Sequence, residues 1–168
     1  IIIGIDLGTT NSLVAFMDKS TQQPRALSDT DGYTIVPSIV HHLPQGGWMV
    51  GREAKNNLVT DPERTIYSVK RLLGRSYKDL EGHGFAYKII DHSNDQSEAL
   101  VKIQIGEKFY SPIELSAEIL KELKALPNFQ SLAYDRMFAH QLILHLEKEG
   151  IRCQHYRSEE RRVGKECR

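Results

Sequence analysis

The sequence predicts a mixed α/β fold built from hairpins and short helices, and three observations lead to this class. Aliphatic runs at residues 1–7 and 12–17, on either side of a tight turn, predict a β-hairpin. Three strand-like runs follow one another between residues 85 and 110, with Gly106-Glu107 as a tight turn. A capping box at 111–114 opens a helix that extends to about residue 125. Because strands follow strands, this is not a regular β-α-β winding.

Between the hairpin and the later strands, the sequence predicts one more β-rich run and two helices. Residues 34–42 read TIVPSIVHH, where Pro37 limits the strand to an edge, a bend or a strand start. Residues 51–59 (GREAKNNLV) favour a short helix. A second helix, with Glu63 to Leu73 as its body, is expected after Asp61 as the N-cap and Pro62 at the first helical position.

The last forty residues have a different composition. Residues 131–149 could form one amphipathic helix. Residues 150–168 carry six Arg and Lys against three Glu and few large apolar side chains, so we expect disorder there. The interleaved glutamates and the scarcity of aromatic side chains argue against a nucleic-acid-binding arm. We therefore expect a domain over residues 1–125 and a separate tail over residues 126–168.

Composition and charge exclude several classes of function. The chain has 168 residues, enough for one domain, and a formal net charge of zero, so no bulk field attracts nucleic acid or an anionic membrane. No apolar run approaches the roughly 18 residues that span a bilayer. Cys153 and Cys167 form no C-x-x-C pair and fit a reducing compartment. We expect a cytoplasmic protein without nucleic-acid or membrane partners.

The turn between the first two strands carries residue types that bind phosphate and metal. Strand alternation places Gly4 and Asp6 on one face, so the glycine leaves that face bare before the carboxylate. A carboxylate at the end of a strand can hold a hydrated Mg²⁺. Residues 8–11 (GTTN) offer backbone N–H groups and two hydroxyls, the donors that a phosphate needs. A plain hairpin turn with incidental threonines is the alternative.

A lysine inside an apolar stripe is the second unusual feature. Ile66, Val69 and Leu73 mark the stripe of the helix expected at 63–73, and Lys70 lies within it. Such a lysine either extends its aliphatic stem along the surface or directs its ammonium toward a phosphate or an attacking water. Together, the two features supply an acid, a phosphate turn and a cation.

The histidines do not predict a metal site. His41 and His42 are adjacent and face opposite sides of a strand. His140 and His145 are five residues apart, which does not match the i, i+4 spacing of a zinc pair. Surface histidines, or buried ones with satisfied hydrogen bonds, are the expectation.

Several stretches resemble the DnaK-type (70-kDa heat-shock) chaperones. GIDLGTTNSLVA resembles the first phosphate loop of that family, and the other stretches occur in the family's order at similar spacing. The stretches are GIDLGTTNSLVA (4–15), VPSIV (36–40), VGREAK (50–55), SVKRLLGRS (68–76) and SPIELSAEILKELKA (111–125). The resemblance covers residues 1 to about 125. It implies an actin-like/RNase H-like ATPase fold, present as an incomplete lobe I: a subdomain with the hairpin phosphate loop plus a small peripheral α/β subdomain.

The resemblance also implies a role for each matching residue, with ATP or ADP and Mg²⁺ as the cofactors. The residues that would surround the β- and γ-phosphates are Gly8, Thr9, Thr10 and Asn11. Asp6 would orient the Mg²⁺-bound waters, and Thr10 would lie closest to the metal and the γ-phosphate. Lys70 would position the attacking water and stabilise charge on the transferred phosphoryl group. Arg71 resembles a residue that relays nucleotide state within the domain.

The resemblance ends near residue 125. There the family continues with a strand reading like A-V-I-T-V-P-A-Y-F, whereas this chain reads LPNFQSLAYD. The chain has no counterpart of the catalytic glutamate, the second metal-organising aspartate or the adenosine pocket. The plainest explanation is a truncated ATP-binding fragment with a non-homologous or out-of-frame tail, and a divergent self-contained domain is the alternative. We expect the fragment alone to be inactive.

For the full-length protein, the resemblance implies an ATP-dependent molecular chaperone in protein folding and stress response. Its partners would be unfolded polypeptides, a J-domain co-chaperone and a nucleotide exchange factor. A branch of the same family that serves iron–sulfur cluster assembly is one alternative. A sugar-kinase-like phosphotransferase of the actin-like superfamily, with the same turn, is another. A remnant without enzymatic activity is the third.

Overall fold

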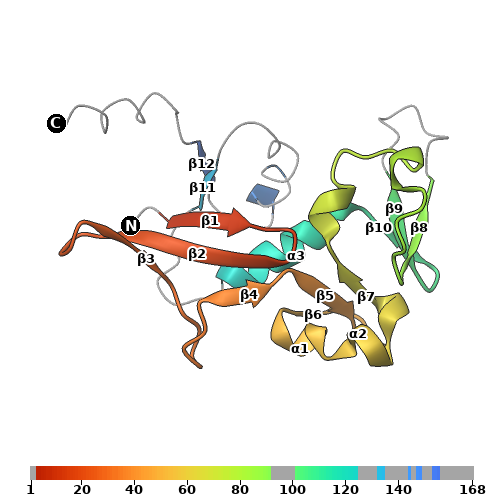
Figure 1. The fold of residues 1–168 in the computed structure, drawn as a ribbon, viewed down its shortest axis with the longest axis horizontal. Helices are drawn as coiled ribbons and strands as arrows, with labels where there is room; N and C mark the ends of the chain where they lie inside the picture. The colour runs from red at the N-terminus through yellow and green to blue at the C-terminus, as the bar shows by residue number, and fades with distance from the viewer. Residues whose placement is uncertain are drawn as a thin grey trace.

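The computed structural model describes residues 3–91, 101–124, 132–134, 144, 147–148 and 153–155. These residues form three β-sheets, several short helices and one longer helix (Figure 1). The mixed α/β class predicted from the sequence is confirmed. The first sheet carries the predicted phosphate turn, and the two smaller sheets lie toward the other end of the molecule in Figure 1.

The first sheet is built around the predicted hairpin. Its strands run in the order β12-β11-β1-β2-β3, with β4 paired to the start of β2. The strands are β1 (Ile3–Leu7), β2 (Asn11–Asp18), β3 (Gln23–Ala26), β4 (Ile35–Pro37), β11 (Leu132–Tyr134) and β12 (Cys153–His155). In the antiparallel β1–β2 pair, Asp6 lies opposite Leu13 and Leu7 opposite Ser12. The hairpin predicted from residues 1–7 and 12–17 is therefore confirmed.

The tail departs from its prediction where the structure describes it. The helix expected at 131–149 is wrong at its start, because Leu132–Tyr134 form β11, which pairs in parallel with β1. The open edge of β1 supplies backbone partners that the amphipathic pattern could not reveal. Residues 144, 147 and 148 are helical, as expected. Cys153–His155 form β12 on β11, so disorder is wrong for these residues, and the rest of the expected disordered end lies outside the described residues.

The two smaller sheets are antiparallel and three-stranded. In one, β5 (Ile39–His42) lies between β6 (Trp48–Val50) and β7 (Thr65–Tyr67). The other is a meander of β8 (Lys88–Ile90), β9 (Lys102–Ile105) and β10 (Lys108–Tyr110), which confirms the strands expected between residues 85 and 110.

Pro37 separates two sheets. The run 34–42 was expected as one β-rich segment, and it forms β4 and β5, which belong to different sheets. Proline has no N–H for a sheet ladder, so a strand tends to end or bend there. Pro37 is the last residue of β4, paired with Asn11, and the chain then turns into β5.

The short helix predicted at 51–59 and the helix predicted from the capping box at 111–114 are confirmed. The first is two single turns, α1 (Arg52–Lys55) and α2 (Asn57–Thr60). The second is α3 (Pro112–Lys124), where the Ser111 N–H and hydroxyl donate to the Glu114 carboxylate at 2.6 and 2.8 Å. The Glu114 N–H donates back to the Ser111 hydroxyl oxygen at 3.2 Å, which completes the capping box.

The helix expected from Glu63 to Leu73 is wrong. This segment forms the 3₁₀ turn η1 (Pro62–Arg64), then strand β7, then a second 3₁₀ turn, η2 (Val69–Leu72). Strand β7 pairs with β5, and this tertiary pairing outweighs the helical spacing of the apolar residues. Ser68, between β7 and η2, has φ +56°, a left-handed conformation that interrupts a right-handed helix.

A single hydrophobic core connects the sheets through α3. Leu115, Ile119 and Leu123 on α3 are fully buried, and the helix packs against η2, β5 and β6. Val14 of β2 belongs to the same cluster, as does Ile103 of β9. The first sheet and the two smaller sheets therefore share one core. A last 3₁₀ turn, η3 (Lys78–Leu80), adds Leu80 to it.

Candidate functional site

The turn between β1 and β2 requires a glycine at its first position. A Cβ atom on Gly8 would overlap the carbonyl oxygen of Asn11, closer than real Cβ atoms come to any backbone atom. At Gly4, by contrast, the nearest atom to an added Cβ is the Ala15 carbonyl oxygen at 3.9 Å, an ordinary contact. Gly8 is thus fixed by the tight turn, whereas Gly4 is exposed and leaves its face open.

Ser38, which follows Pro37, donates hydrogen bonds to the backbone of the turn. Its N–H donates to the Thr10 carbonyl at 2.9 Å, and its hydroxyl donates to the Gly8 carbonyl at 2.9 Å. The Ser38 hydroxyl oxygen lies 2.8 Å from that of Ser12, and both side chains are buried. Since the single hydrogen of Ser38 goes to Gly8, the Ser12 hydroxyl donates to Ser38. The sequence did not predict a role for either serine, because the stretch VPSIV, which contains Ser38, contributed only to the family resemblance.

This clamp leaves the donor side of the turn free. The two carbonyls accept from Ser38, whereas the N–H groups and hydroxyls of Thr9 and Thr10 bond to no group in the part of the chain that the structure describes. Thr10 and Asn11 are exposed, and Thr9 is half-buried. Free N–H groups on a rigid turn bind an anion without further reorganisation. The cradle predicted from GTTN is compatible with this geometry.

Asp6 lies at the base of the same turn. It is exposed near the end of β1 and has no ion pair among the described residues. A carboxylate without a cationic partner can accept hydrogen bonds from water molecules around a divalent cation. Elsewhere, no group of three or more His, Cys, Asp or Glu among the described residues is close enough to hold a metal.

Lys70 and Arg71 are presented on η2 in a way that the sequence did not predict. Val69 and Leu72 are buried at a spacing of three, which is the period of a 3₁₀ helix, and they anchor the turn in the core. Lys70 and Arg71 lie between them and are exposed. The placement of Lys70 inside an apolar stripe is therefore wrong. Neither cation has an ion-pair partner among the described residues.

One hollow brings the two predicted features near each other. The lining of a cavity of about 420 Å³ includes Thr9, Thr10 and Ser38 as well as Tyr67 and Ser68. Ser68 directly precedes η2, and η2 lies beside the tip of the β1–β2 hairpin in Figure 1. Neither Lys70 nor Arg71 lines the cavity. The structure therefore places the residue that precedes η2 at the cavity, and not the Lys70 ammonium.

Tyr87 fixes the backbone that leads into η2, and sequence reasoning missed it. Its hydroxyl donates to the Tyr67 carbonyl at 2.6 Å, and its ring packs against Tyr67 at 5.4 Å between centroids. Burial raises the pKa of Tyr87, so the hydroxyl keeps the proton that it donates. The contact joins residues 20 positions apart, and no local pattern of the sequence marks it.

The two adjacent histidines are both buried. The His41 Nδ1 lies 2.9 Å from the Thr65 hydroxyl oxygen, and Thr65 in turn donates to the Asp61 carbonyl at 2.6 Å. Because that hydroxyl has one hydrogen, His41 Nδ1 carries the proton of its bond to Thr65. His41 therefore has the satisfied hydrogen bond expected of a structural histidine.

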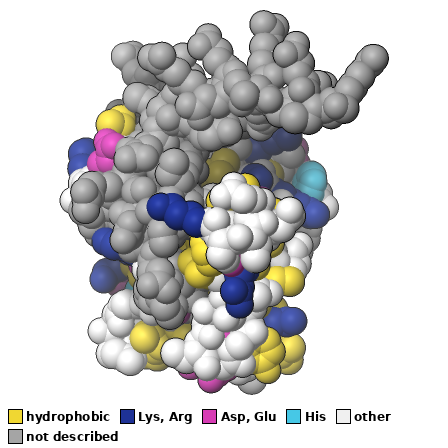
Figure 2. All heavy atoms as spheres, turned by 90° about the vertical axis from the view of Figure 1, so that its left-hand side faces the viewer, with side chains coloured by type: hydrophobic (Ala, Val, Ile, Leu, Met, Phe, Trp, Pro, Cys, Tyr) yellow, Lys and Arg dark blue, Asp and Glu magenta, His cyan; other side chains and the backbone are white. Residues whose placement is uncertain are grey.

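The surface has no continuous basic stripe on the face that Figure 2 shows, as far as the described residues go. Lys and Arg side chains there are scattered among neutral and apolar ones. Within the same residues, no helix is both long and apolar enough to cross a membrane.

A family comparison decides the assignment. A sequence model described as "Hsp70 protein" matches residues 2–131, well over half of the chain. The chain belongs to the Hsp70 family. The resemblance predicted from the phosphate turn and SVKRLLGRS is confirmed.

Relatives of this Hsp70 chain carry a chaperone name. It is similar to the "Chaperone protein HscA homolog" of Burkholderia cenocepacia (strain HI2424), of Burkholderia orbicola (strain MC0-3) and of Burkholderia ambifaria (strain MC40-6). Each is 44% identical over 123 residues, which cover 73% of this chain and 19% of the relative. The chain thus spans about a fifth of the length of the curated relatives that it matches.

Proposed function

We propose that residues 1–125 are the first lobe of an Hsp70 nucleotide-binding domain, with an actin-like fold, and that the β1–β2 turn binds the phosphates of ATP or ADP. The observation that carries this proposal is the turn itself. Ser38 fixes its carbonyls, its Thr9 and Thr10 donors bond to no described group, and it lines a cavity together with Ser68, which precedes η2. Family membership supports the choice of nucleotide over other phosphate ligands.

Each candidate residue has a role in this proposal. Asp6 holds the waters of a bound Mg²⁺, and Thr10 adds its hydroxyl near the metal. The N–H groups and hydroxyls of residues 8–11 donate to the phosphate oxygens. When bound, Mg²⁺ supplies positive charge that offsets the charge on the phosphates.

The cations of η2 complete the site. Lys70 orients the attacking water and stabilises negative charge on the phosphoryl group as it is transferred. Arg71, its neighbour, relays nucleotide state to the rest of the domain. Both side chains are exposed and without an ion pair among the described residues, so they are free to move toward a ligand in the cavity.

For the longer protein that the relatives represent, we propose an ATP-dependent chaperone located in the cytoplasm. ATP binding and hydrolysis would change its affinity for unfolded polypeptides, with a J-domain co-chaperone and an exchange factor as partners. The tail is proposed to be non-homologous beyond residue 131, where the family match ends, and the described chain alone to be catalytically inactive. A sugar-kinase-like activity gains no support from the family match.

A second candidate is the branch of the same family that serves iron–sulfur cluster assembly. The relatives that carry the name HscA homolog, at 44% identity, favour this branch over a general chaperone. Both candidates use the same nucleotide site, so the test below applies to either.

The test is a titration of the ¹⁵N-labelled chain with Mg-ATP, followed by NMR. We expect shifts at the amides of residues 8–11 and of Lys70 and Arg71. We expect a dissociation constant no tighter than roughly millimolar, since only one side of the site is present. A Thr10→Val variant should weaken binding several-fold, whereas Thr60→Val, an exposed threonine on α2, should not.

The alternatives give different results. The phosphate assignment would be refuted if the amides of residues 8–11 did not shift at a Mg-ATP concentration 20 times the expected dissociation constant of about 1 mM. Micromolar affinity would keep the assignment but overturn the view that this lobe is an incomplete site. AMP, which lacks the β- and γ-phosphates, should bind more weakly than ATP if the turn contacts those groups.

A further inference from the structure

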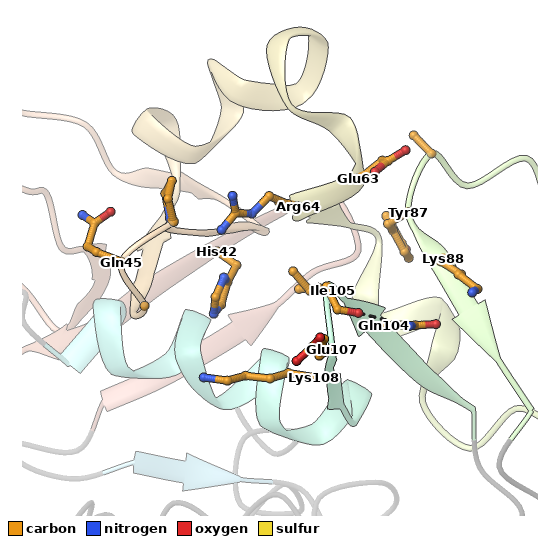
Figure 3. Close-up of a pocket in the computed structure, with 14 residues that line it drawn as sticks. His42, Gln45, Glu63, Arg64, Tyr87, Lys88, Gln104, Ile105, Glu107 and Lys108 are labelled. Carbon is orange, nitrogen blue, oxygen red and sulfur yellow. Dashed lines mark hydrogen bonds between the residues drawn. The ribbon is translucent and has the colours of Figure 1, made fainter.

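A second and larger hollow lies apart from the phosphate turn. Its volume is about 880 Å³, and it is bounded by η1, by the turn between β5 and β6, and by the β8–β10 sheet (Figure 3). None of its lining residues belongs to the 8–11 turn or to η2. Ala86 is the one residue that lines both hollows.

Cations reach this hollow from three separate elements. Arg64 comes from η1, Lys88 from β8 and Lys108 from β10. In Figure 3, Arg64 and Lys108 lie on opposite sides of His42, a residue of β5 that also lines the hollow. Convergence of cations from distant parts of the sequence is a feature of anion sites.

The two cations beside His42 have side-chain N–H groups without a hydrogen-bond acceptor among the described residues. Arg64 forms an ion pair with Asp61, in which the Arg64 Nε lies 4.0 Å from Asp61 Oδ2, too far for a hydrogen bond. Lys108 has no ion pair among the described residues. A guanidinium and an ammonium that make no hydrogen bond to a carboxylate in the described residues can each donate to a phosphate oxygen.

The pKa of His42 is sensitive to the positive charges at this end of the hollow. The residue is 8% exposed, and its Nδ1 is buried without a hydrogen-bond partner in the described residues. Burial lowers the pKa of His42, and the charges of Arg64, Lys108 and His41 lower it further. Arg64 and Lys108, the two cations that lower it, also line the hollow.

The other side chains named near the His42 ring are aromatic, and two carboxylates also line the hollow. The Tyr110 hydroxyl lies 3.1 Å from His42 Nε2, and Trp48 packs edge-on to the ring at 5.0 Å between centroids. Glu63 and Glu107 line the same hollow and oppose the binding of an anion. Their presence predicts a weak site and not a tight one.

We propose that this hollow binds a phosphate group, as free phosphate or as a phosphate monoester, through the Arg64 guanidinium and the Lys108 ammonium. His42 does not contact the anion, because its Nδ1 is buried. It responds to the bound charge instead: an anion bound at either cation offsets positive charge near the ring, so the pKa of His42 rises when the site is filled.

The test is an NMR titration of the ¹⁵N-labelled chain at fixed ionic strength. Inorganic phosphate, O-phosphoserine and acetate are compared, with sodium chloride as the balancing salt, because screening alone also raises the pKa of His42. We expect saturable shifts at the amides of Gly46, Gly106 and Lys108 with phosphate, and a rise in the pKa of His42 beyond that in chloride. Equal binding of phosphoserine identifies a monoester site, and binding of inorganic phosphate alone identifies a free-anion site.

Variants separate binding from general electrostatics. Lys108→Gln should weaken phosphate binding at least five-fold, and Arg64→Gln should do the same. Lys78→Gln, which removes an exposed lysine on η3 outside the hollow, should change it less than two-fold. The proposal is overturned if no shift saturates, if acetate and chloride act like phosphate, or if the Lys78 and Lys108 variants weaken binding equally. Shifts confined to Thr9 and Thr10 would also overturn it, and would support the nucleotide site instead.

Discussion

Single atoms decide the geometry of the phosphate turn. We predict that Gly8→Ala destabilises the chain by about 2–3 kcal/mol, because the new methyl group overlaps the Asn11 carbonyl oxygen and the turn must open. Urea unfolding followed by circular dichroism measures this change. The affinity of the turn for Mg-ATP should fall as well, since Thr9 and Thr10 lose their fixed positions.

Gly4 supplies the matched control. A Cβ atom there meets only the Ala15 carbonyl oxygen at 3.9 Å, so Gly4→Ala should leave stability unchanged or raise it by up to about 0.5–1 kcal/mol. Equal losses for both variants would mean that strand propensity, and not the tight turn, sets the requirement for glycine.

At the residue scale, the sequence indicates the groups that local chemistry marks, and their roles in a site stay predictions. The turn 8–11 and the acid at the end of β1 stand out because glycine, threonine and an interrupting aspartate have few other uses in an aliphatic hairpin. Ser38 and Tyr87 could not be found in this way. Their partners, the carbonyls of Gly8 and Tyr67, lie 30 and 20 positions away, and backbone carbonyls leave no trace in a sequence.

At the scale of the element, helix α3 was predictable because its signals are local. The capping box spans four residues, and its three hydrogen bonds are all present. The segment from Glu63 to Leu73 was not predictable from its apolar spacing, since Ile66 pairs across to Val40 of β5. Two or three apolar residues at helical spacing cannot outweigh a strand partner supplied from elsewhere in the chain.

The capping box gives a prediction for this helix. Ser111→Ala removes the hydroxyl that accepts from the Glu114 N–H and donates to its carboxylate, so we expect a loss of about 1 kcal/mol. Chemical denaturation measures it. Glu118→Gln, which alters only the partly exposed pair with Lys121 on the same helix, should cost less than about 0.5 kcal/mol. A loss in Ser111→Ala no larger than in Glu118→Gln would contradict a capping role.

At the scale of the whole molecule, α3 is what unites the sheets. Its buried face belongs to the same hydrophobic cluster as Val14 of the first sheet and Ile103 of the β8–β10 sheet. The sequence predicted the helix and the strands but not this arrangement, because an apolar stripe shows that a face is buried and not what buries it. The same limit applies to β11, whose pairing with β1 depends on an edge more than a hundred residues earlier in the chain.

A shared core predicts cooperative unfolding. Leu115 is fully buried on α3, so Leu115→Ala should cost about 2–5 kcal/mol through lost burial and a residual cavity. If the core is continuous, native-state hydrogen exchange should show loss of protection in β2, β5 and β9 together, because all three strands contribute to the cluster that α3 covers. Val59→Ala, at a side chain that is 89% exposed, should change stability by less than about 0.5 kcal/mol. If β9 lost protection while β2 kept it, the sheets would unfold as separate units, and the phosphate turn would then be stable without the rest of the chain.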